Sequence, residues 1–550
     1  MKQPLVVLGT AGFIVLMVWL LKPVPKSDRW DIDVDGNALE TKQLFLKTLR
    51  EQNSNAAATA AGKPNVIFLL ADDLGKYDVS LYRRAVQPVP ASYAEKIETP
   101  NIDALGKNGV VYRNAYVTAP ICGPSRAGLM TGRYQNRFGF ESQPMQRYVR
   151  NNLEYLWFRY VIDTNDMTPI RYENYPRAEM LPLQGLPVSE ITLADVFKAT
   201  GYSTGIFGKW HLGYGPMNHP NRFGFDQQYG FIEAFSLYAP EGDNNIMSYH
   251  HTTFSEKHIW SQQRSGPSAI TRNGEVVDEK RYLTDAIVDE TKQFIHRAAE
   301  TKQPFFAYVA FNAVHTPFQA RKPDYDSITN VSDDKTRVYQ AMTKRLDWAV
   351  GELVRYLQEQ GLAENTLIIF ASDNGGASYT AAMDNAPLRG GKLSQYEGGL
   401  QVPFMIAWPG KLAARDVEQP VILTDIFATL ASQLGVSLPT DRVYDGTNLL
   451  AKGVEQTLAD RPLFWRSDYN HAIRFHQWKL IRNDHDHTVK LFDLAQDPGE
   501  RHNLTADKPE IVRDLTERLD AWEKQLQPAK WPRVMDFRMQ SEGETDTFAI

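Results

Sequence analysis

Residues 65–73 read Asn-Val-Ile-Phe-Leu-Leu-Ala-Asp-Asp, an apolar run that stops on two adjacent carboxylates. An apolar run of this length without polar alternation predicts a strand that is buried on both faces of a sheet. The pattern recurs in strands expected over 202–207, 305–311 and 366–370, and polar or charged residues follow each of them. The chain therefore carries at least four buried strands of one kind.

Helical patterns separate these strands, for example over 192–200 and 338–358. Strands that alternate with helices predict an α/β fold, with a large, mostly parallel sheet sandwiched by helices. Ligands of such sheets bind beyond the carboxyl ends of the strands. We therefore expect the polar groups that follow the strands to share one site.

Oxygen ligands end two of these strands. Asp72 and Asp73 follow the first, and Asp373 and Asn374 follow the last. Paired acids and an Asp-Asn-Gly sequence are each also common in solvated turns. Together they supply the carboxylate and amide oxygens that Ca²⁺ or Mg²⁺ takes, whereas a zinc site would need cysteine pairs or a His-x-x-x-His pattern. We predict one bound Ca²⁺ ion.

The composition excludes several classes of protein. A chain of 550 residues with 43% hydrophobic and 23% charged residues folds in water around a sizeable core. Its net charge of −6 lacks the basic excess of a nucleic-acid binder, so no nucleic-acid partner is expected. A single cysteine, Cys122, excludes intramolecular disulfides, multi-cysteine zinc sites and iron–sulfur clusters.

Cys122 opens the sequence Cys-Gly-Pro-Ser-Arg over 122–126, just before a helix expected to begin near Ser125. A thiol there lies near backbone N–H groups and the positive end of a helix. A lone cysteine is more often a small buried apolar residue. The segment, however, resembles the Cys-x-Pro-Ser-Arg signature of the type I sulfatases of the alkaline phosphatase superfamily. In that family the cysteine is oxidised to formylglycine.

The resemblance extends from Asn65 to Leu504. Further segments match the family's motifs in the family's order: Asn65–Asp73, Thr99–Asp103, Gly208–Gly213, His315–Pro317, Asp373–Gly375, Gly390–Lys392, Leu491–Leu494, Asp497–Glu500 and Asn503–Leu504. It implies an alkaline-phosphatase-like catalytic domain over 64–455. A C-terminal α+β subdomain over 456–530, a small antiparallel sheet with one helix, is expected next. We expect residues 531–550 to be a tail.

The resemblance also implies a hydrated formylglycine at position 122 whose hydroxyl attacks sulfur. Asp72, Asp73, Asp373, Asn374 and residue 122 itself would hold the calcium ion. The ordinary alternative for the acidic residues is solvated turn chemistry.

Five further residues carry over as catalytic ones. Arg126 would fix the nucleophile, and Lys209 and Lys392 would bind sulfate oxygens. His211 would take a proton from the nucleophile, while His315 would contact sulfate and donate to the leaving oxygen, although these acid and base roles could be exchanged. The alternative to these catalytic roles is a structural one: Arg126 would be a structural arginine, the lysines would be solvated in loops, and the histidines would be hydrogen-bonded structural residues.

The N-terminus predicts export. Residues 5–21 carry no charge and precede Lys22, Lys26 and Arg29. We read 1–22 as a signal peptide or signal anchor, and favour the anchor because no Ala-x-Ala cleavage site adjoins the run; a buried core helix is the other alternative. Residues 23–63 are expected to be a linker. Export without disulfides indicates a bacterial periplasm or cell surface, with membrane contact only through the N-terminal segment.

These features predict a sulfuric ester hydrolase acting on a sulfated polysaccharide or oligosaccharide, with a marine galactan such as carrageenan as the first candidate. Its specificity is expected from the aromatic and basic segments 140–185 and 232–282. A formylglycine-generating or sulfatase-maturating enzyme is the expected partner. The alternatives are a phosphomonoesterase, phosphodiesterase or phosphonate hydrolase of the same superfamily, or a catalytically inactive glycan-binding module.

Overall fold

The computed structural model describes residues 13, 15–27, 30, 32, 35–54, 63–162, 164, 166–171, 174–250 and 254–550. Most of the N-terminal run that predicts export therefore lies outside the described residues. No helix among the described residues has both the length and the hydrophobicity needed to cross a bilayer.

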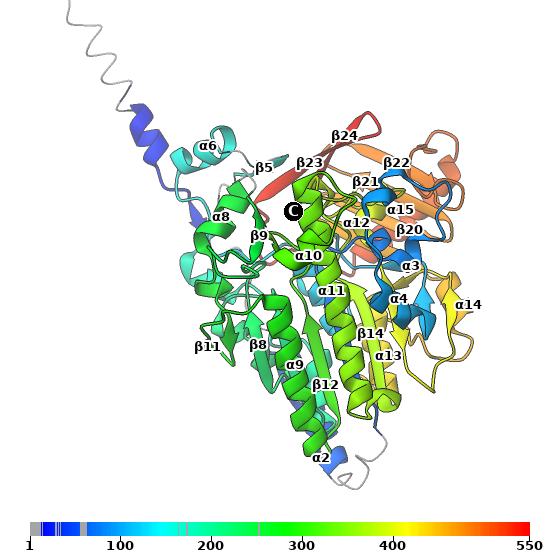
Figure 1. Cartoon of the computed structure of the whole chain (residues 1–550). Coiled ribbons are helices and arrows are strands. Elements are labelled where there is room, and N and C mark those ends of the chain that lie inside the picture. The colour runs from blue at the N-terminus through cyan, green and yellow to red at the C-terminus, as the bar shows by residue number, and fades with distance from the viewer. Residues whose placement is uncertain are drawn as a thin grey trace, which may run out of the picture.

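A ten-stranded mixed sheet forms the centre of the molecule (Figure 1). Its middle consists of five mutually parallel strands, in the order β8 (Gln227–Phe231), β7 (Ser203–Lys209), β12 (Phe305–Ala310), β2 (Asn65–Ala71) and β14 (Thr366–Ser372). Antiparallel pairs extend the sheet at both sides, through β10 (Thr271–Arg272), β11 (Glu275–Val276), β16 (Phe404–Ala407) and β3 (Val110–Tyr112). The α/β class is confirmed, and the parallel core contains all four strands expected from the sequence.

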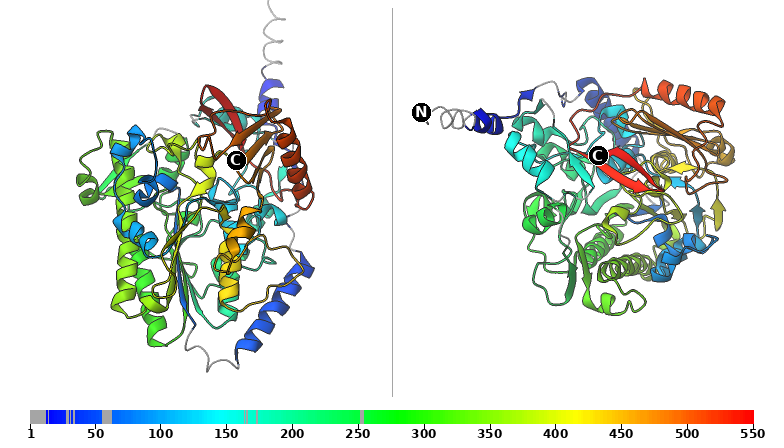
Figure 2. Two further views of the ribbon diagram at one scale, coloured as in Figure 1. Left: turned by 90° about the vertical axis from the view of Figure 1, so that its right-hand side faces the viewer. Right: turned by 90° about the horizontal axis from the view of Figure 1, so that it is seen from above.

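Helices cover both faces of the sheet (Figure 2). One face carries α4 (Pro100–Lys107), α9 (Leu283–Glu300) and α11 (Asp334–Glu359), and the other carries α5 (Cys122–Thr131), α7 (Leu193–Ala199) and α13 (Thr424–Gln433). Strand β2 serves both resulting cores: Phe68 and Leu70 pack into one, and Ile67 and Leu69 into the other. This two-sided burial explains why the run has no polar alternation.

The C-terminal subdomain is a four-stranded antiparallel sheet of β19 (Leu463–Ser467), β20 (Asn470–Phe475), β21 (Trp478–Asn483) and β22 (Thr488–Asp493). Helix α15 (Pro509–Glu523) packs on β20 and β21. Trp522 of this helix stacks on Phe464 with ring centroids 4.9 Å apart. The small antiparallel sheet with one helix is therefore confirmed.

The expectation of a tail over 531–550 is wrong. Strands β23 (Met535–Ser541) and β24 (Glu544–Ala549) form a hairpin that adds β5 (Met167–Pro169) to make a three-stranded sheet. Phe537 and Met539 alternate with more exposed polar residues and bury their side chains. Gly543 closes the hairpin turn with a φ of 77°, a conformation open to glycine without strain.

The expected linker over 23–63 also contains structure. Strand β1 (Lys26–Ser27) pairs with β6 (Tyr175–Pro176), and helix α2 (Gly36–Ser54) packs on α7. Leu46 and Leu49 of α2 are buried at helical spacing. The side chain of Lys42 is buried and its Nζ lies 2.7 Å from Asp195 Oδ2. An amphipathic helix therefore anchors this segment to the catalytic domain.

Candidate active site

Strand register brings the acidic residues together. Ala71 of β2 pairs with Ser372 of β14, so the residues that follow each strand lie side by side at the carboxyl edge of the sheet. The backbone N–H of Asp73 donates to Asp373 Oδ1 at 3.3 Å, and Asn374 Nδ2 donates to Asp73 Oδ1 at 2.7 Å. All four predicted acidic and amide residues, including Asp72, are buried.

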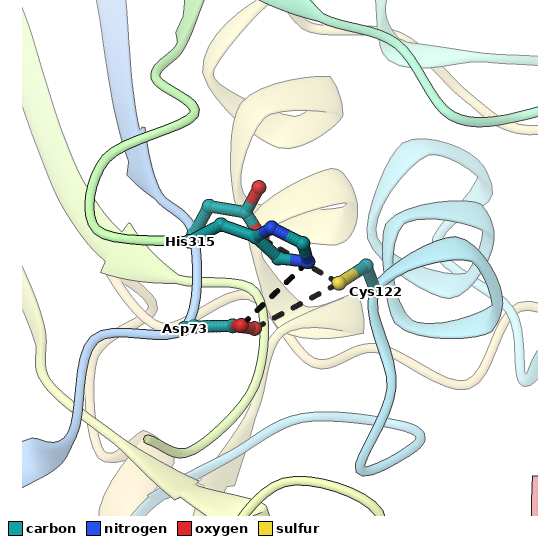
Figure 3. Close-up of side chains that lie close together, drawn as sticks. Asp73, Cys122 and His315 are labelled. Carbon is teal, nitrogen blue, oxygen red and sulfur yellow. Dashed lines mark hydrogen bonds and ion pairs between the residues drawn. The ribbon is translucent and has the colours of Figure 1, made fainter. Parts of the chain in front are cut away.

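Cys122 faces these carboxylates from across the edge of the sheet (Figure 3). It is the first residue of α5, so the helix begins three residues earlier than expected from the sequence. Its Sγ lies 3.4 Å from Asp72 Oδ1 and 3.8 Å from Asp73 Oδ1. Burial, aided by the charge of Asp373, raises the pKa of the thiol well above its usual range and outweighs the helix terminus.

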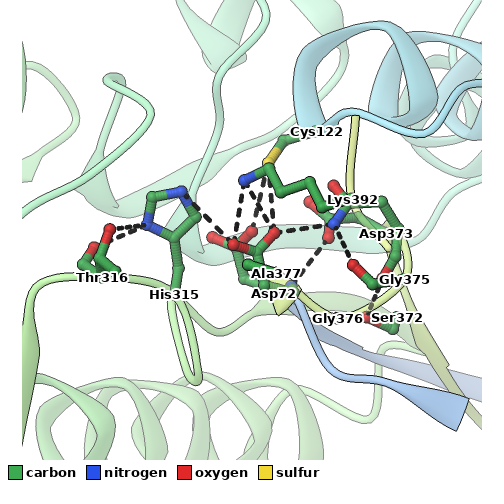
Figure 4. A network of polar contacts seen from close by, with 12 residues as sticks. Asp72, Cys122, His315, Thr316, Ser372, Asp373, Gly375, Gly376, Ala377 and Lys392 are labelled. Carbon is green, nitrogen blue, oxygen red and sulfur yellow. Dashed lines mark hydrogen bonds and ion pairs between the residues drawn. The ribbon is translucent and has the colours of Figure 1, made fainter. Parts of the chain in front are cut away.

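Three buried cations pair with three buried carboxylates. Figure 4 shows part of this network, with Lys392, Asp72 and Asp373 close to Cys122. The closest contacts are Lys209 Nζ to Asp72 Oδ2 at 2.6 Å, Lys392 Nζ to Asp73 Oδ1 at 2.8 Å, and Arg126 Nε to Asp373 Oδ2 at 2.7 Å. Arg126 Nη1 also donates to the carbonyl oxygen of Lys209 at 3.1 Å. Charges buried to this extent are retained only where they are paired, and here strand ends and loops from distant parts of the chain supply the partners.

Burial and the neighbouring charges shift the pKa values of Asp72 and Asp73 in opposite directions. Burial and the charge of Asp373 raise the pKa of Asp72 to about 7, although Lys209 acts in the opposite direction. Burial by itself would raise the pKa of Asp73, but the charges of Lys392 and His315 outweigh burial and hold this pKa well below its usual range. One edge of the sheet thus holds carboxyl groups of different proton affinity, as is common at functional sites.

Two histidines complete the cluster. His315 Nε2 lies 3.7 Å from Asp73 Oδ2, and its Nδ1 lies 2.6 Å from the carbonyl oxygen of Thr316. Both ring nitrogens of His211 are buried and have no hydrogen-bond partner among the described residues. Burial is the main reason that the pKa of His315 falls to about 3 and that of His211 well below its usual value. His211 has a φ of 59°, an uncommon backbone conformation for a residue other than glycine.

The donor atoms fit a hard divalent cation. Ligand atoms of Asp72, Asp73, Cys122 and His315 lie within 4.8 Å of one another. Asn374 contacts Asp73 through its Nδ2. Its Oδ1 is buried and accepts no hydrogen bond from any described residue. An orphaned amide oxygen beside clustered carboxylates is what a calcium or magnesium ion would satisfy. The predicted ligands are thus adjacent, with Asp373 turned toward Arg126.

The fold and this site together define the class of protein. It is an α/β protein of alkaline-phosphatase-like fold with a candidate metal centre at the carboxyl edge of its sheet. Residues 64–436 match the family model described as Sulfatase. Residues 391–525 match the model described as N-sulphoglucosamine sulphohydrolase, C-terminal. The chain belongs to the sulfatase family and is a sulfatase.

Named relatives span most of the chain. It is 30% identical to N-acetylgalactosamine-6-sulfatase of Homo sapiens, over 86% of this chain and 88% of the relative. It is 29% identical to N-acetylgalactosamine-6-O-sulfatase of Bacteroides thetaiotaomicron, over 84% of this chain and 93% of the relative. The crystal structure of Ps i-CgsB in complex with k-i-k-neocarrahexaose aligns with a TM-score of 0.69 and 30% identity, covering 85% and 94% of the two chains.

Sequence reasoning missed a residue behind the site. Arg389 is buried and donates from Nε to Ser541 Oγ at 2.7 Å and from Nη1 to the carbonyl oxygen of Glu500 at 2.9 Å. Its guanidinium lies 4.2 Å from the ring centroid of Tyr396. These contacts tie the loop that carries Lys392 to the C-terminal hairpin. The alternation of apolar residues over 535–539 is the sequence signal that could have revealed the hairpin.

Arg389→Ala is expected to lower kcat for sulfate release roughly ten- to a hundredfold, because the Lys392 ammonium is then less well positioned. KM should change less than kcat, since the hydrogen bonds of Arg389 are with the C-terminal hairpin and Glu500 and not with the residues proposed to bind sulfate. Steady-state kinetics measures both. Arg518→Ala, which removes an exposed arginine of α15 paired with Asp514, is the matched control and should leave both constants unchanged. An Arg389→Ala protein that melts earlier but keeps its kcat would assign Arg389 a structural role alone.

Proposed function

We propose that this sulfatase removes sulfate from a sulfated carbohydrate, using a formylglycine made from Cys122 and one Ca²⁺ ion. The observation that carries the proposal is the single buried cluster in which Cys122 meets Asp72, Asp73 and their paired lysines. This is the combination of nucleophile, metal ligands and sulfate-binding cations that sulfate ester hydrolysis needs.

Asp72, Asp73, Asp373 and Asn374 would hold the calcium ion, with residue 122 beside it. When bound there, calcium would supply charge that polarises a sulfate oxygen, and formylglycine would supply the attacking hydroxyl. The carboxyl groups of Asp72, Asp73 and Asp373 supply buried oxygen donors for the ion, and the paired cations keep these groups in place before it binds.

The cations of the cluster would bind the sulfate group. Lys209 enters from the end of β7 and Lys392 from a loop, and their ammonium groups lie beside Asp72 and Asp73. From there they can donate to sulfate oxygens and offset charge that grows on them in the transition state. Arg126 is pinned by Asp373 and by the carbonyl oxygen of Lys209, which suits a residue that orients the nucleophile.

The histidines would move protons. The contact of His315 Nδ1 with the Thr316 carbonyl assigns the Nδ1 proton to that hydrogen bond and leaves Nε2 to exchange a proton with the leaving oxygen. His211 has two unpartnered ring nitrogens among the described residues and would take a proton from the nucleophile. Both rings are buried at the site, where they can exchange protons with a bound substrate.

A cavity of about 550 Å³, which is lined by residues outside this cluster, would receive the sugar. Gln143, which lines it, lies 3.8 Å from the position that a Cβ on Gly123 would occupy. Glu233 lines it as well and accepts a hydrogen bond from Tyr214 at 2.7 Å. Most of its lining comes from the two segments, 140–185 and 232–282, that the sequence singles out for specificity, and Tyr214, Val534 and Met535 complete it. Aromatic rings around a few polar groups suit stacking on a sugar face.

We propose a sulfated sugar of galactose configuration as the substrate, with carrageenan as the first candidate. The named relatives support this, since two act on N-acetylgalactosamine 6-sulfate by name and the structural neighbour was crystallised with a neocarrahexaose. A panel of sulfated oligosaccharides, with carrageenan and N-acetylgalactosamine esters side by side, tests the choice through released sulfate.

Phe235→Leu, in the cavity, is expected to raise KM for the preferred oligosaccharide about tenfold, because leucine keeps apolar volume but cannot stack on a sugar. Hydrolysis of a small aryl sulfate, which has no sugar to stack, should stay unchanged and serves as the control. Equal losses with both substrates would contradict a sugar-binding role for this cavity.

Chelation of the metal is expected to lower sulfate release about a hundredfold or more, because a Lewis acid contributes several kcal/mol to such a transition state. Added Ca²⁺ should restore the rate, and Mg²⁺ should restore it less. Sulfate release that is indifferent to chelation would overturn the calcium proposal.

The decisive experiment joins two measurements: the mass of the tryptic peptide that contains residue 122, and sulfate release from the oligosaccharide panel. An aldehyde mass with sulfate release supports the proposal. An aldehyde without sulfate release, together with turnover of phosphate mono- or diesters or of phosphonates, would transfer the chain to the phosphohydrolase branch. Binding of glycans without release of any ester would support an inactive glycan-binding module.

We also propose that the protein is exported to a bacterial periplasm or cell surface and held there by its N-terminal segment. The uncharged run 5–21 followed by Lys22 and Lys26 supports this. Fractionation of cells that produce the full chain, with the N-terminal mass of the purified protein, distinguishes an anchor from a cleaved signal.

A further inference from the structure

Helix α6 (Asn152–Tyr160) exposes an apolar face. The exposed fractions are 41% for Leu153, 54% for Trp157, 76% for Tyr160 and 57% for Val161, which follows the helix. This spacing places the four side chains on one side of the helix. Phe158, on another side, lines the cavity proposed to receive the sugar. A contiguous exposed apolar face that includes aromatic residues is uncommon on a soluble domain and indicates a binding surface.

The N-terminal segment leaves the body of the protein next to this face (Figure 1). Residues 15–21 are helical, and Asn152 Nδ2 of α6 donates to the carbonyl oxygen of Trp19 at 2.8 Å. Just beyond, the backbone N–H of Val24 donates to the carbonyl oxygen of Arg150 at 3.0 Å. The short helix is itself apolar and exposed, at Val15, Leu16, Val18, Trp19 and Leu21. Two apolar surfaces thus lie side by side, joined by hydrogen bonds.

Basic residues lie beside the two surfaces, and Arg147 and Arg150 among them both pair with Glu154. The structure describes residues 15–27 and 144–162, which include these surfaces. These two stretches contain one acidic residue, Glu154, and five basic ones: Lys22, Lys26, Arg147, Arg150 and Arg159. Arg150 is 78% exposed at its side chain and Arg147 59%. Basic residues beside exposed tryptophan and tyrosine suit the headgroup layer of an anionic membrane.

We propose that α6 and the helical residues 15–21 together form a lipid-docking face, which binds the interface of an anionic bilayer without α6 crossing it. This extends membrane contact beyond the N-terminal segment to the catalytic domain. A bilayer is favoured over a protein partner because residues 15–21, which end the uncharged run, lie against this face and the neighbouring charge is mostly basic. Docking in this way would hold the cavity wall formed by Phe158 close to the lipid surface.

A vesicle assay with the full chain tests the face. Trp157→Glu combined with Tyr160→Glu is expected to weaken binding to vesicles of phosphatidylcholine and phosphatidylglycerol about tenfold or more, because two aromatic side chains no longer enter the interface. The matched control replaces Val276 and Val443, which are 74% and 51% exposed elsewhere, by glutamate and should bind as the unaltered chain does. Salt should weaken binding by screening the basic residues. Equal binding by both double variants would overturn the proposal.

A fluorescent label on α6 reports contact of this helix with lipid separately from any vesicle binding by the N-terminal segment. Tyr160→Cys offers one exposed thiol for an environment-sensitive fluorophore, since the natural cysteine, Cys122, is buried. The label is expected to shift to the blue on addition of vesicles and to be quenched by brominated lipid, whereas a label at Val276→Cys should do neither. A label at 160 that ignores vesicles would overturn the proposal. A blue shift that needs only higher protein concentration would do so too, by assigning the face to a second copy of the chain.

Discussion

Replacing Cys122 by alanine is expected to lower sulfate release roughly 10⁴-fold or more, the scale seen when an enzyme loses its nucleophile. Alanine removes the one side chain of the cluster that can be oxidised to formylglycine, while Lys209, Lys392 and both histidines stay. Among the described residues, the hydrogen-bond partners of the thiol are two carboxylate oxygens, at 3.4 and 3.8 Å, so its loss should leave the fold intact. Ion chromatography of released sulfate measures the effect, and the melting temperature checks the fold.

Two comparisons make this result specific. The alanine variant should still bind the oligosaccharide by calorimetry, because the cavity and the sulfate-binding lysines are unchanged. Protein with unaltered sequence, produced without a maturating enzyme, should be as inactive as the variant, since its protonated, buried thiol is a poor nucleophile. Turnover within tenfold of the converted enzyme in either case would mean that another group attacks sulfur.

Replacing Lys479 by methionine is expected to destabilise the protein by about 3–5 kcal/mol, the cost of leaving buried charge without its partner. Lys479 lies on β21, is fully buried, and places Nζ 2.8 Å from both Glu397 Oε1 and Glu500 Oε1. Glu397 opens helix α12 (Glu397–Leu400), five residues after Lys392, and its backbone N–H donates to Glu500 at 2.7 Å. One ammonium therefore joins the C-terminal sheet to the loop of the active site.

The pH dependence of the protein's stability follows in part from the carboxyl groups of Glu397 and Glu500. Burial, with the charge of Glu397, raises the pKa of Glu500 from 4.5 to about 7. Its stabilising contribution is thus complete below pH 4.5 and is lost as the pH rises toward 7. The pKa of Glu397 falls from 4.5 to about 2, since Lys479 and Arg474 outweigh burial, so its contribution is present above 4.5 and lost as the pH falls toward 2.

Without Lys479, both carboxyl groups must take protons to remain buried. The cost of Lys479→Met should therefore grow between about pH 5 and pH 8, as measured by urea unfolding at each pH. Adding Glu500→Gln to this variant should recover part of the loss, because one buried charge disappears. Lys322→Met is the control: it breaks an exposed pair with Asp326 in α10 (Lys322–Asp326) and should cost less than about 1 kcal/mol. Equal costs for the two lysines would contradict the argument.

Several features were open to prediction from local sequence. Strand β2 and the acids that end it follow from one uninterrupted apolar run, and the Cys-Gly-Pro-Ser-Arg segment carries its own family signature. The C-terminal hairpin was missed although Phe537 and Met539 alternate with polar residues, because a short edge pattern near a chain end has few neighbours to confirm it. Helix α2 was missed in the same way, since its buried stripe includes a lysine, Lys42, that only the partner Asp195 explains.

By itself, the sequence determined the fold class, because burial on two faces of a strand is a pattern within a short stretch. It also named ten candidate site residues, through short motifs that resemble those of a known family. Only the tertiary structure decided which charges pair. The ion pairs of Lys209 with Asp72 and of Lys479 with Glu397, and the hydrogen bond of Arg389 with Ser541, join residues that are 82 to 152 positions apart. Strand register and loop packing bring such groups together, and the pKa of each depends on the sum of those neighbours and on burial, which no local pattern encodes.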